Sequence, residues 1–371
     1  MKCVCISCFD HYPTRFKFIT EFFRQGGYET YYIISDYLHF EKKHSKVEHP
    51  DVIHIHVPGY KKNMSPVRLY SHCVFANGVY RKLEIIKPDV IYCMFPPNML
   101  VKKCAQYKDR HPEVKLIFDC YDSWPESMPM KSSLLNVPFS IWRNLRDKYL
   151  ESADKAICVS ELGKEWLSKL HPNLSISVLY PRLDNRAEIS YCSDVSDSIK
   201  FCYLGNINYI TDVDLMVSLL AAICSKKKVI LHHVGGGQNL IELEDKLNKV
   251  GVEFILHGSI FDIEKKEEIF SRCNLGLNLP RKEINSSMSL KSVEYMRAGI
   301  PFVNSGTGDN WNIVEKWGIG INCTRDNFQN ATETLINLQS TECQKMHEKI
   351  KVLYKSMFSS PDYNFIFKNV L

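Results

Sequence analysis

The residue types best suited to chemistry gather in one run, residues 285–301 (NSSMSLKSVEYMRAGIP). Apolar residues at helical spacing, followed by a glycine, predict a helix over Ser289–Ala298. Serines 286, 287 and 289 stand at its start, where one serine caps the helix and the free backbone N–H groups form an anion site. Lys291 falls in the first turn, where a cation is unfavourable by about 0.3–1 kcal/mol unless an anion such as a diphosphate binds there.

Glu294 lies one turn beyond Lys291, on the same face of the predicted helix. A carboxylate at this position can accept both hydroxyl groups of a ribose whose diphosphate lies at the helix start. The alternative is an intrahelical Lys291–Glu294 pair, which contributes only about 0.2–0.5 kcal/mol and has the less favourable order of charges. We therefore predict that Ser287, Ser289, Lys291 and Glu294 belong to a site for a nucleotide diphosphate.

The elements that must position this site form two successive series of short apolar strands and amphipathic helices. Both faces of the strands are apolar, which is typical of parallel sheets covered by helices. We expect an α/β protein with two doubly wound sheets and a cleft between them. Its predicted parts are a domain over residues 1–180, a polar linker over 181–198, a second domain over 199–340, and a helical segment over 341–371 for which a return to the first domain is one option. In such sheets, ligands bind beyond the carboxyl ends of the strands.

Charge and composition exclude several classes of protein. The 371 residues include 47 basic and 42 acidic side chains, of which 25 and 19 lie in the first 180 residues. This balance is too weak to argue for nucleic acid, whereas the lysines of the first half could face an anionic lipid surface. The 14 cysteines lie scattered in apolar runs, as in a reduced compartment, and no run approaches the roughly 18–20 apolar residues that span a bilayer. We expect a cytoplasmic protein, with a peripheral position at the inner face of the membrane as an option.

At this point the chain resembles a known family. The run Ser289–Pro301 is similar to the nucleotide-sugar signature of GT-B-fold glycosyltransferases, most of all retaining glycosyltransferase family four of the bacterial capsule and cell-surface polysaccharide type. Further similar segments cover most of the chain: Tyr60–Arg68, Lys87–Tyr92, Leu116–Ser127, Tyr203–Asn206 and Asn304–Gly320. The resemblance implies two Rossmann-like domains facing a central cleft, with the acceptor on the first and the nucleotide sugar on the second.

For the second domain, the resemblance implies individual roles. Glu294 matches the second of two family glutamates and would hold the ribose, whereas the first falls on Ser286. The Arg and Lys that usually follow the first strand are missing, so Lys291 with Arg281 would supply the positive charge.

The strand-end glycines Gly205, Gly235–Gly237 and Gly258 match positions at which the backbone approaches the nucleotide. Asn206, next to Gly205, is a further candidate for binding the donor. An ordinary turn is the alternative for each glycine.

In the first domain, acidic residues follow the predicted strand Lys115–Cys120. Many relatives carry a His where this chain has Tyr121, which leaves Asp122 as the first choice for orienting or deprotonating the acceptor hydroxyl. Asp119 and Glu126 are the next candidates after Asp122 for this role. The alternative is an Asp whose carboxylate binds the N–H groups of a turn.

Two arginines complete the acceptor-side candidates. Arg15 follows the first predicted strand and could face the phosphates from this side. Arg68 is the last residue of segment 60–68, which is rich in hydrogen-bond donors. This segment could belong to an acceptor site, and a solvated helix start is an equally good interpretation.

No metal is expected at the site. The pair Asp212 and Asp214 resembles a DxD metal motif but opens a predicted helix, where acidic residues are favoured in any case. Cys5 and Cys8 form a CxxC without a second ligand pair, so a buried strand is the better interpretation.

The sequence thus predicts a glycosyltransferase, of the hexosyltransferase type, that moves a sugar from a nucleotide diphosphate sugar to a lipid-linked or oligosaccharide acceptor in surface polysaccharide biosynthesis. Lys291 and Asp122 are the predicted catalytic residues. The co-substrate is expected to be a UDP-sugar, with no other cofactor, and the family implies retention at the anomeric carbon. Two alternatives stay open: a non-catalytic partner that binds nucleotide sugar, and a nucleotide-sugar epimerase on the same fold.

Overall fold

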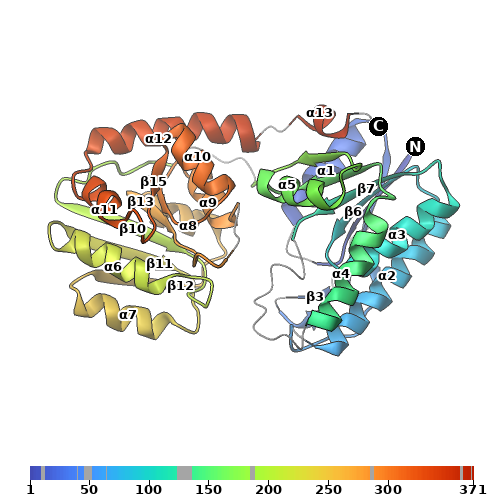
Figure 1. Cartoon of the computed structure of the whole chain (residues 1–371), viewed down its shortest axis with the longest axis horizontal. Helices are drawn as coiled ribbons and strands as arrows, with labels where there is room; N and C mark the ends of the chain where they lie inside the picture. Colours follow the sequence, from blue (N-terminus) through green and yellow to red (C-terminus); the bar gives the residue numbers. More distant parts are fainter. Residues whose placement is uncertain are drawn as a thin grey trace. The chain divides into compact units, whose positions relative to one another are not determined.

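The computed structural model describes residues 1–9, 13–39, 41–45, 52–63, 65–122, 136–183, 189–284, 288–359, 362–368 and 370–371. The chain divides into two compact units, Met1–Tyr180 together with Asp362–Leu371, and Pro181–Pro361. Each unit contains a parallel sheet with helices packed against it (Figure 1). The predicted α/β class with two doubly wound sheets is confirmed.

The first unit is built on a seven-stranded sheet of order β5-β2-β1-β6-β7-β8-β9. Its strands are β1 (Lys2–Ser7), β2 (Glu29–Ser35), β5 (Val52–Ile55), β6 (Val90–Phe95), β7 (Lys115–Cys120), β8 (Lys155–Cys158) and β9 (Ile176–Val178). Its helices are α1 (Pro13–Gln25), α2 (Pro66–Ile86), α3 (Asn98–Arg110), α4 (Asn136–Leu150), α5 (Glu161–Leu170) and α13 (Tyr363–Phe367). A short antiparallel hairpin, β3 (Tyr37–Leu38) and β4 (Lys43–His44), was not expected from the sequence.

Both faces of this sheet are buried, as the apolar strands predict. In β1, Val4 and Ile6 belong to the core shared with α2 and α3, which run beside α4 in Figure 1. Cys3 and Cys5 point to the other face, where α1 and the chain end pack. The ring of Phe367 in α13 stacks on Phe22 of α1 with 5.1 Å between centroids, so the last ten residues are part of the first unit.

A buried ion pair ties α1 to this sheet. Arg15 donates to both carboxylate oxygens of Asp119, through Nε at 2.6 Å and Nη2 at 2.8 Å, and Tyr92 also donates to the same carboxylate. A third Arg15 nitrogen, Nη1, donates to the carbonyl oxygen of Leu179 at 2.9 Å. Arg15 and Asp119 are 6% and 0% exposed, so their charges satisfy each other inside the unit. The two acceptor-side candidates are thus engaged with each other in the first unit.

The second unit holds a six-stranded sheet of order β12-β11-β10-β13-β14-β15. Its strands are β10 (Ser198–Leu204), β11 (Lys228–Val234), β12 (Glu253–Gly258), β13 (Leu275–Asn278), β14 (Phe302–Asn304) and β15 (Gly320–Asn322). Its helices are α6 (Val213–Cys224), α7 (Leu240–Lys249), α8 (Ile263–Phe270), α9 (Leu290–Arg297), α10 (Asp309–Trp317), α11 (Phe328–Ile336) and α12 (Ser340–Tyr354), the last continued by a π-helical turn, η2 (Lys355–Ser359).

Helices of the second unit form layers of their own. Helix α6 packs between α7 and α11, and α12 packs on α9 (Figure 1). The strands place their carboxyl ends at one edge of the sheet, because all of its pairings are parallel. The residues that follow β10, β11, β12, β13 and β14 are therefore neighbours in space. None of the helices in the described ranges is both long and apolar enough to cross a membrane.

We predict that Arg15→Met lowers the free energy of unfolding by about 3–5 kcal/mol, because the Asp119 carboxylate would stay buried without its partner. Denaturant titration of the whole chain measures this loss. The control is Arg81→Met on the exposed surface of α2, which should change stability by less than about 0.5 kcal/mol. Equal stability of the two variants would contradict the structural role of the pair.

Candidate functional site: the start of helix α9

Ser289 is the serine that caps α9. Its Oγ accepts a hydrogen bond from the backbone N–H of Ser292 at 3.1 Å, as an N-cap side chain does. Among the described residues, the N–H groups of Leu290 and Lys291 then have no acceptor, and these are the groups that can bind an anion. Ser289 therefore shapes the predicted anion site through its cap. Ser287 lies outside the described residues.

A row of three asparagines, of which Asn278 and Asn304 are buried, supports the cap. Asn278, Asn304 and Asn322 end the neighbouring strands β13, β14 and β15, and their registers place them side by side. Asn278 Nδ2 donates to Asn304 Oδ1 at 2.8 Å, and Asn304 Nδ2 donates to Asn322 Oδ1 at 2.9 Å. Ser289 Oγ lies 3.1 Å from Asn278 Oδ1 and can donate to it. The carboxyl edge of the sheet thus fixes the helix start, a role the sequence interpretation missed.

Tyr295 fixes the orientation of α9 against the sheet. Its buried hydroxyl accepts the N–H of Leu204 at 3.0 Å and lies 3.2 Å from the carbonyl oxygens of Cys202 and Leu277. Gly276 in β13 leaves room for the ring, since a Cβ there would lie 2.6 Å from Tyr295. Burial raises the pKa of Tyr295 well above its usual value, so the hydroxyl stays neutral.

Lys291 lies in the first turn of α9, as predicted. Its Nζ lies 3.9 Å from the ring centroid of Tyr203 in β10, a cation–π contact. Next to it, the ring of His233 bonds through Nε2 to the carbonyl oxygen of Gly205 at 2.9 Å. Burial lowers the pKa of His233; the Gly205 bond opposes this, and the charge of Lys291 lowers it further. The positive charge at this place therefore belongs to the lysine.

The loops after β10, β11 and β12 contain glycines with positive φ: +113° at Gly205, +149° at Gly235 and +73° at Gly258. A Cβ on Gly235 would lie 2.3 Å from the Gly205 carbonyl oxygen, so these two loops pack backbone against backbone. At Gly205, the nearest atom to an added Cβ is Lys291 Cε at 4.0 Å, and at Gly258 none lies within 4 Å. Asn206 accepts the N–H of Gly236 at 3.2 Å and orders the first loop.

Glu294 pairs with a residue that the sequence did not indicate. Lys266 of α8 approaches Glu294 Oε2 with its Nζ at 2.8 Å, and both side chains are mostly buried, at 13% and 19% exposure. A second pair of opposite order, Arg297 with Glu267 at 2.7 Å, joins the same two helices. In the described part of the chain, Glu294 thus pairs with Lys266 of the neighbouring helix and not with Lys291 of its own helix.

Arg281 follows β13 and lines a pocket of about 340 Å³ in the second unit. Its Nε donates to the Thr211 carbonyl oxygen at 3.3 Å. Asp212 and Asp214 also line this pocket, but both are engaged: Asp212 caps α6 and binds Arg325 at 2.9 Å, and Asp214 pairs with Lys246 at 2.9 Å. Their use in these contacts agrees with the prediction that they act as helix-start residues.

The remaining acceptor-side candidates lie in the first unit. Asp122 is exposed just after β7, and Glu126 lies outside the described residues. Arg68 is in the first turn of α2, where its guanidinium lies 5.5 Å and 5.7 Å from the ring centroids of Phe9 and Tyr60. Cys5 and Cys8 are both buried, as a first-strand interpretation predicts.

The comparisons with known proteins define the class of this site. Residues 198–340, most of the second unit, match the family model of glycosyl transferases group 1. The match contains every described donor-side residue named above, from Gly205 to Glu294. The predicted enzyme class, a glycosyltransferase, is confirmed. A comparison with curated protein sequences gives no significant match.

Solved structures share the fold over almost the whole chain. The lipopolysaccharide outer core galactosyltransferase WaaB, in its apo form, is similar with a TM-score of 0.68 and 16% identity, over 100% of this chain and 99% of that one. HepE from Anabaena in complex with UDP gives 0.67 and 15%, over 97% and 96%. Sucrose-phosphate synthase from Thermosynechococcus elongatus gives 0.71 and 13%, over 97% and 95%. These likenesses confirm the GT-B fold with two Rossmann-like halves.

We predict that Tyr295→Phe lowers the free energy of unfolding by about 1–3 kcal/mol, because the buried Leu204 N–H would lose its acceptor. Thermal or denaturant unfolding measures the change. Tyr70→Phe, at a tyrosine that is 62% exposed in α2, is the matched control and should be neutral. If the two substitutions cost the same, the hydroxyl of Tyr295 does not fix α9.

Proposed function

We propose that this protein transfers a sugar from a UDP-sugar to a lipid-linked or oligosaccharide acceptor in surface polysaccharide biosynthesis. The observation that carries the proposal is Lys291, a cation in the first turn of α9 next to the glycine of the β10 loop. Such a position is unfavourable for a lysine by itself and becomes favourable when an anion binds. The group 1 domain match makes a nucleotide diphosphate the fitting anion.

In the proposed donor site, the diphosphate lies at the start of α9. The N–H groups of Leu290 and Lys291 and the Lys291 ammonium stabilise the charge that develops on the leaving diphosphate, without a metal ion. Arg281 adds to this positive charge. Gly205, Asn206 and Gly258 let the nucleotide approach the strand-end loops closely.

Glu294 supports the proposed contact with the ribose, and the solved relatives support the choice of uridine as the nucleoside. Glu294 accepts the ribose hydroxyls while Lys266 holds its Oε2. HepE has been solved with UDP and with UDP-glucose, which supports a UDP-sugar as the donor. The sugar itself is taken as a hexose by analogy with these relatives.

The acceptor is proposed to bind the first unit. Asp122 is exposed at the carboxyl end of β7, where a carboxylate can orient or deprotonate an acceptor hydroxyl. The resemblance to family four and to capsule enzymes supports retention at the anomeric carbon. The similarity to WaaB, a lipopolysaccharide galactosyltransferase, supports a lipid-linked acceptor, and the basic balance of the first 180 residues supports a peripheral position on anionic lipid.

We expect Lys291→Ala and Glu294→Ala each to weaken UDP-sugar binding by at least about tenfold, since hydrogen bonds to charged groups contribute about 1.5–3 kcal/mol. Calorimetry against a panel of sugar nucleotides measures the affinity. Lys249→Ala, at the exposed end of α7, is the control for loss of a lysine. Unchanged UDP-sugar affinity in both site variants would contradict the donor-site assignment.

Asp122→Asn should keep the affinity for the donor and slow transfer by about 10²–10⁴-fold, the usual effect of losing a general base. The assay follows UDP release from the sugar nucleotide in the presence of a lipid-linked acceptor extract. Asp109→Asn, at an exposed position of α3, is the matched control. Transfer at the rate of the unmodified protein would remove Asp122 from the mechanism.

A further inference from the structure

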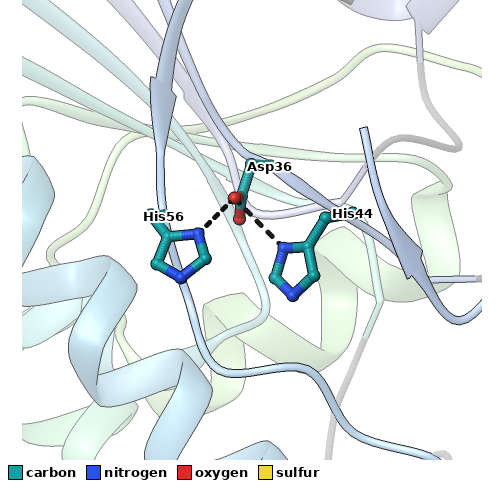
Figure 2. A group of neighbouring side chains, drawn as sticks. All are labelled: Asp36, His44 and His56. Atoms are coloured by element: carbon teal, nitrogen blue, oxygen red, sulfur yellow. Dashed lines mark hydrogen bonds and ion pairs between the residues drawn. The ribbon is translucent and has the colours of Figure 1, made fainter. Parts of the chain in front are cut away.

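Two histidines and one aspartate meet in the first unit, and none of the three has a role assigned above. Asp36 directly follows β2 and His56 directly follows β5, and the parallel register pairs Ser35 with Ile55, so the two residues leave adjacent strands together. The hairpin register pairs Tyr37 with His44, which brings His44 back beside Asp36. Figure 2 shows both imidazoles turned toward the carboxylate.

The three side chains converge on one point. His56 Nδ1 lies 2.5 Å and His44 Nδ1 lies 3.1 Å from Asp36 Oδ2, and all three donor atoms lie within 4.8 Å of one another. The other carboxylate oxygen, Oδ1, accepts the N–H of Val57 at 3.1 Å, which turns Oδ2 toward the histidines. The rings of His44 and His56 stack at 5.0 Å, and the Nδ1 atoms of both face Asp36 Oδ2.

We propose that Asp36, His44 and His56 bind one divalent transition-metal ion of the zinc class. Two imidazole nitrogens and one carboxylate oxygen are ligands of zinc, cobalt and nickel, whereas magnesium and calcium prefer oxygen alone. Ligand atoms of a tetrahedral zinc site lie about 3.4 Å apart, given bonds of about 2.0–2.1 Å. The longest separation here, at most 4.8 Å, needs only a small rotation of exposed rings. Because His56 is 81% exposed, a water molecule can take the fourth position.

The Asp36 carboxylate is held in place before any metal binds. Its Oδ2 faces Nδ1 of His56 and of His44, and its Oδ1 accepts the Val57 N–H. Without metal, each histidine donates an Nδ1–H to this carboxylate. Zinc would replace these two protons on Nδ1 and bind three neighbouring groups at once.

Metal binding would fix the hairpin on the edge of the sheet. His44 lies in β4, and the hairpin also contacts the loop before α2: Lys42 Nζ donates to Asn63 Oδ1 at 2.6 Å, and Tyr37 donates to the Tyr60 carbonyl oxygen. That loop precedes Arg68, a proposed acceptor-side residue. The metal would therefore have a structural role in the first unit and no part in the transfer reaction.

The test is a zinc titration of the full chain, with any purification tag removed and metal stripped beforehand, in competition with a chromophoric chelator. We expect one zinc ion per chain. His56→Ala and Asp36→Asn should each weaken binding by at least about tenfold, because loss of even an outer-shell partner costs about 10–100-fold. Zinc should also raise the melting temperature of the unmodified chain but not of His56→Ala, whose exposed side chain is not needed for folding.

His111→Ala is the matched control, since this histidine also faces two carboxylates, at 3.7 Å and 3.8 Å, but does not belong to the cluster. It should bind zinc like the unmodified chain. Cobalt(II) substitution identifies the ligands: weak visible bands without a thiolate-to-cobalt charge-transfer band support imidazole and carboxylate. Equal zinc affinity of His56→Ala and the unmodified chain, a thiolate band, or no binding at about 100 μM zinc would each overturn the proposal.

Discussion

Tyr295 connects α9 to two strands of the second sheet, and the arrangement of the proposed donor site depends on this contact. Its hydroxyl reaches backbone atoms of β10 and β13, and its ring occupies the space that Gly276 leaves empty. Helix α9 has only eight residues, too few to be stable alone. Its direction is set by this anchor near one end and, at the other, by the cap of Ser289 on the asparagine row. Lys291 and Glu294 lie between the two anchors.

The contacts of α9 with α8 complete this arrangement from the side. Two ion pairs of opposite order, Lys266–Glu294 and Glu267–Arg297, resist sliding and rotation of the two helices, because either movement would bring like charges together. They are largely shielded from solvent and hence less screened than surface pairs. Glu294 therefore has a fixed carboxylate before any ligand arrives, and part of the ordering cost of binding is already met by the fold.

Local patterns predicted the elements well, and contacts between distant segments escaped them. Strand Lys115–Cys120 was predicted at the observed residues, and the helix predicted over Ser289–Ala298 is observed as Leu290–Arg297, because their apolar patterns are continuous in sequence. The hairpin β3–β4 was missed, since two-residue strands have no measurable periodicity. Lys266 and the convergence of His44 with His56 depend on how separate elements pack. No spacing in the sequence reports such contacts.

The position of a polar residue after a strand does not say whether its charge is satisfied by partners inside its own unit. Arg15 and Asp119 both follow or end strands, yet they neutralise each other in the core with hydrogen bonds from three sides. The sequence position of Lys291 says no more about its partners than that of Arg15 does. Among the described residues, however, the Lys291 ammonium contacts only the ring face of Tyr203. A buried charge whose partners are complete is part of the fold. A half-buried cation at a helix start, where the helix dipole is unfavourable for positive charge, can instead bind an anion. The completeness of the partners, which only the packed structure gives, is therefore what separates Lys291, the lysine of the proposed donor site, from the core arginine Arg15.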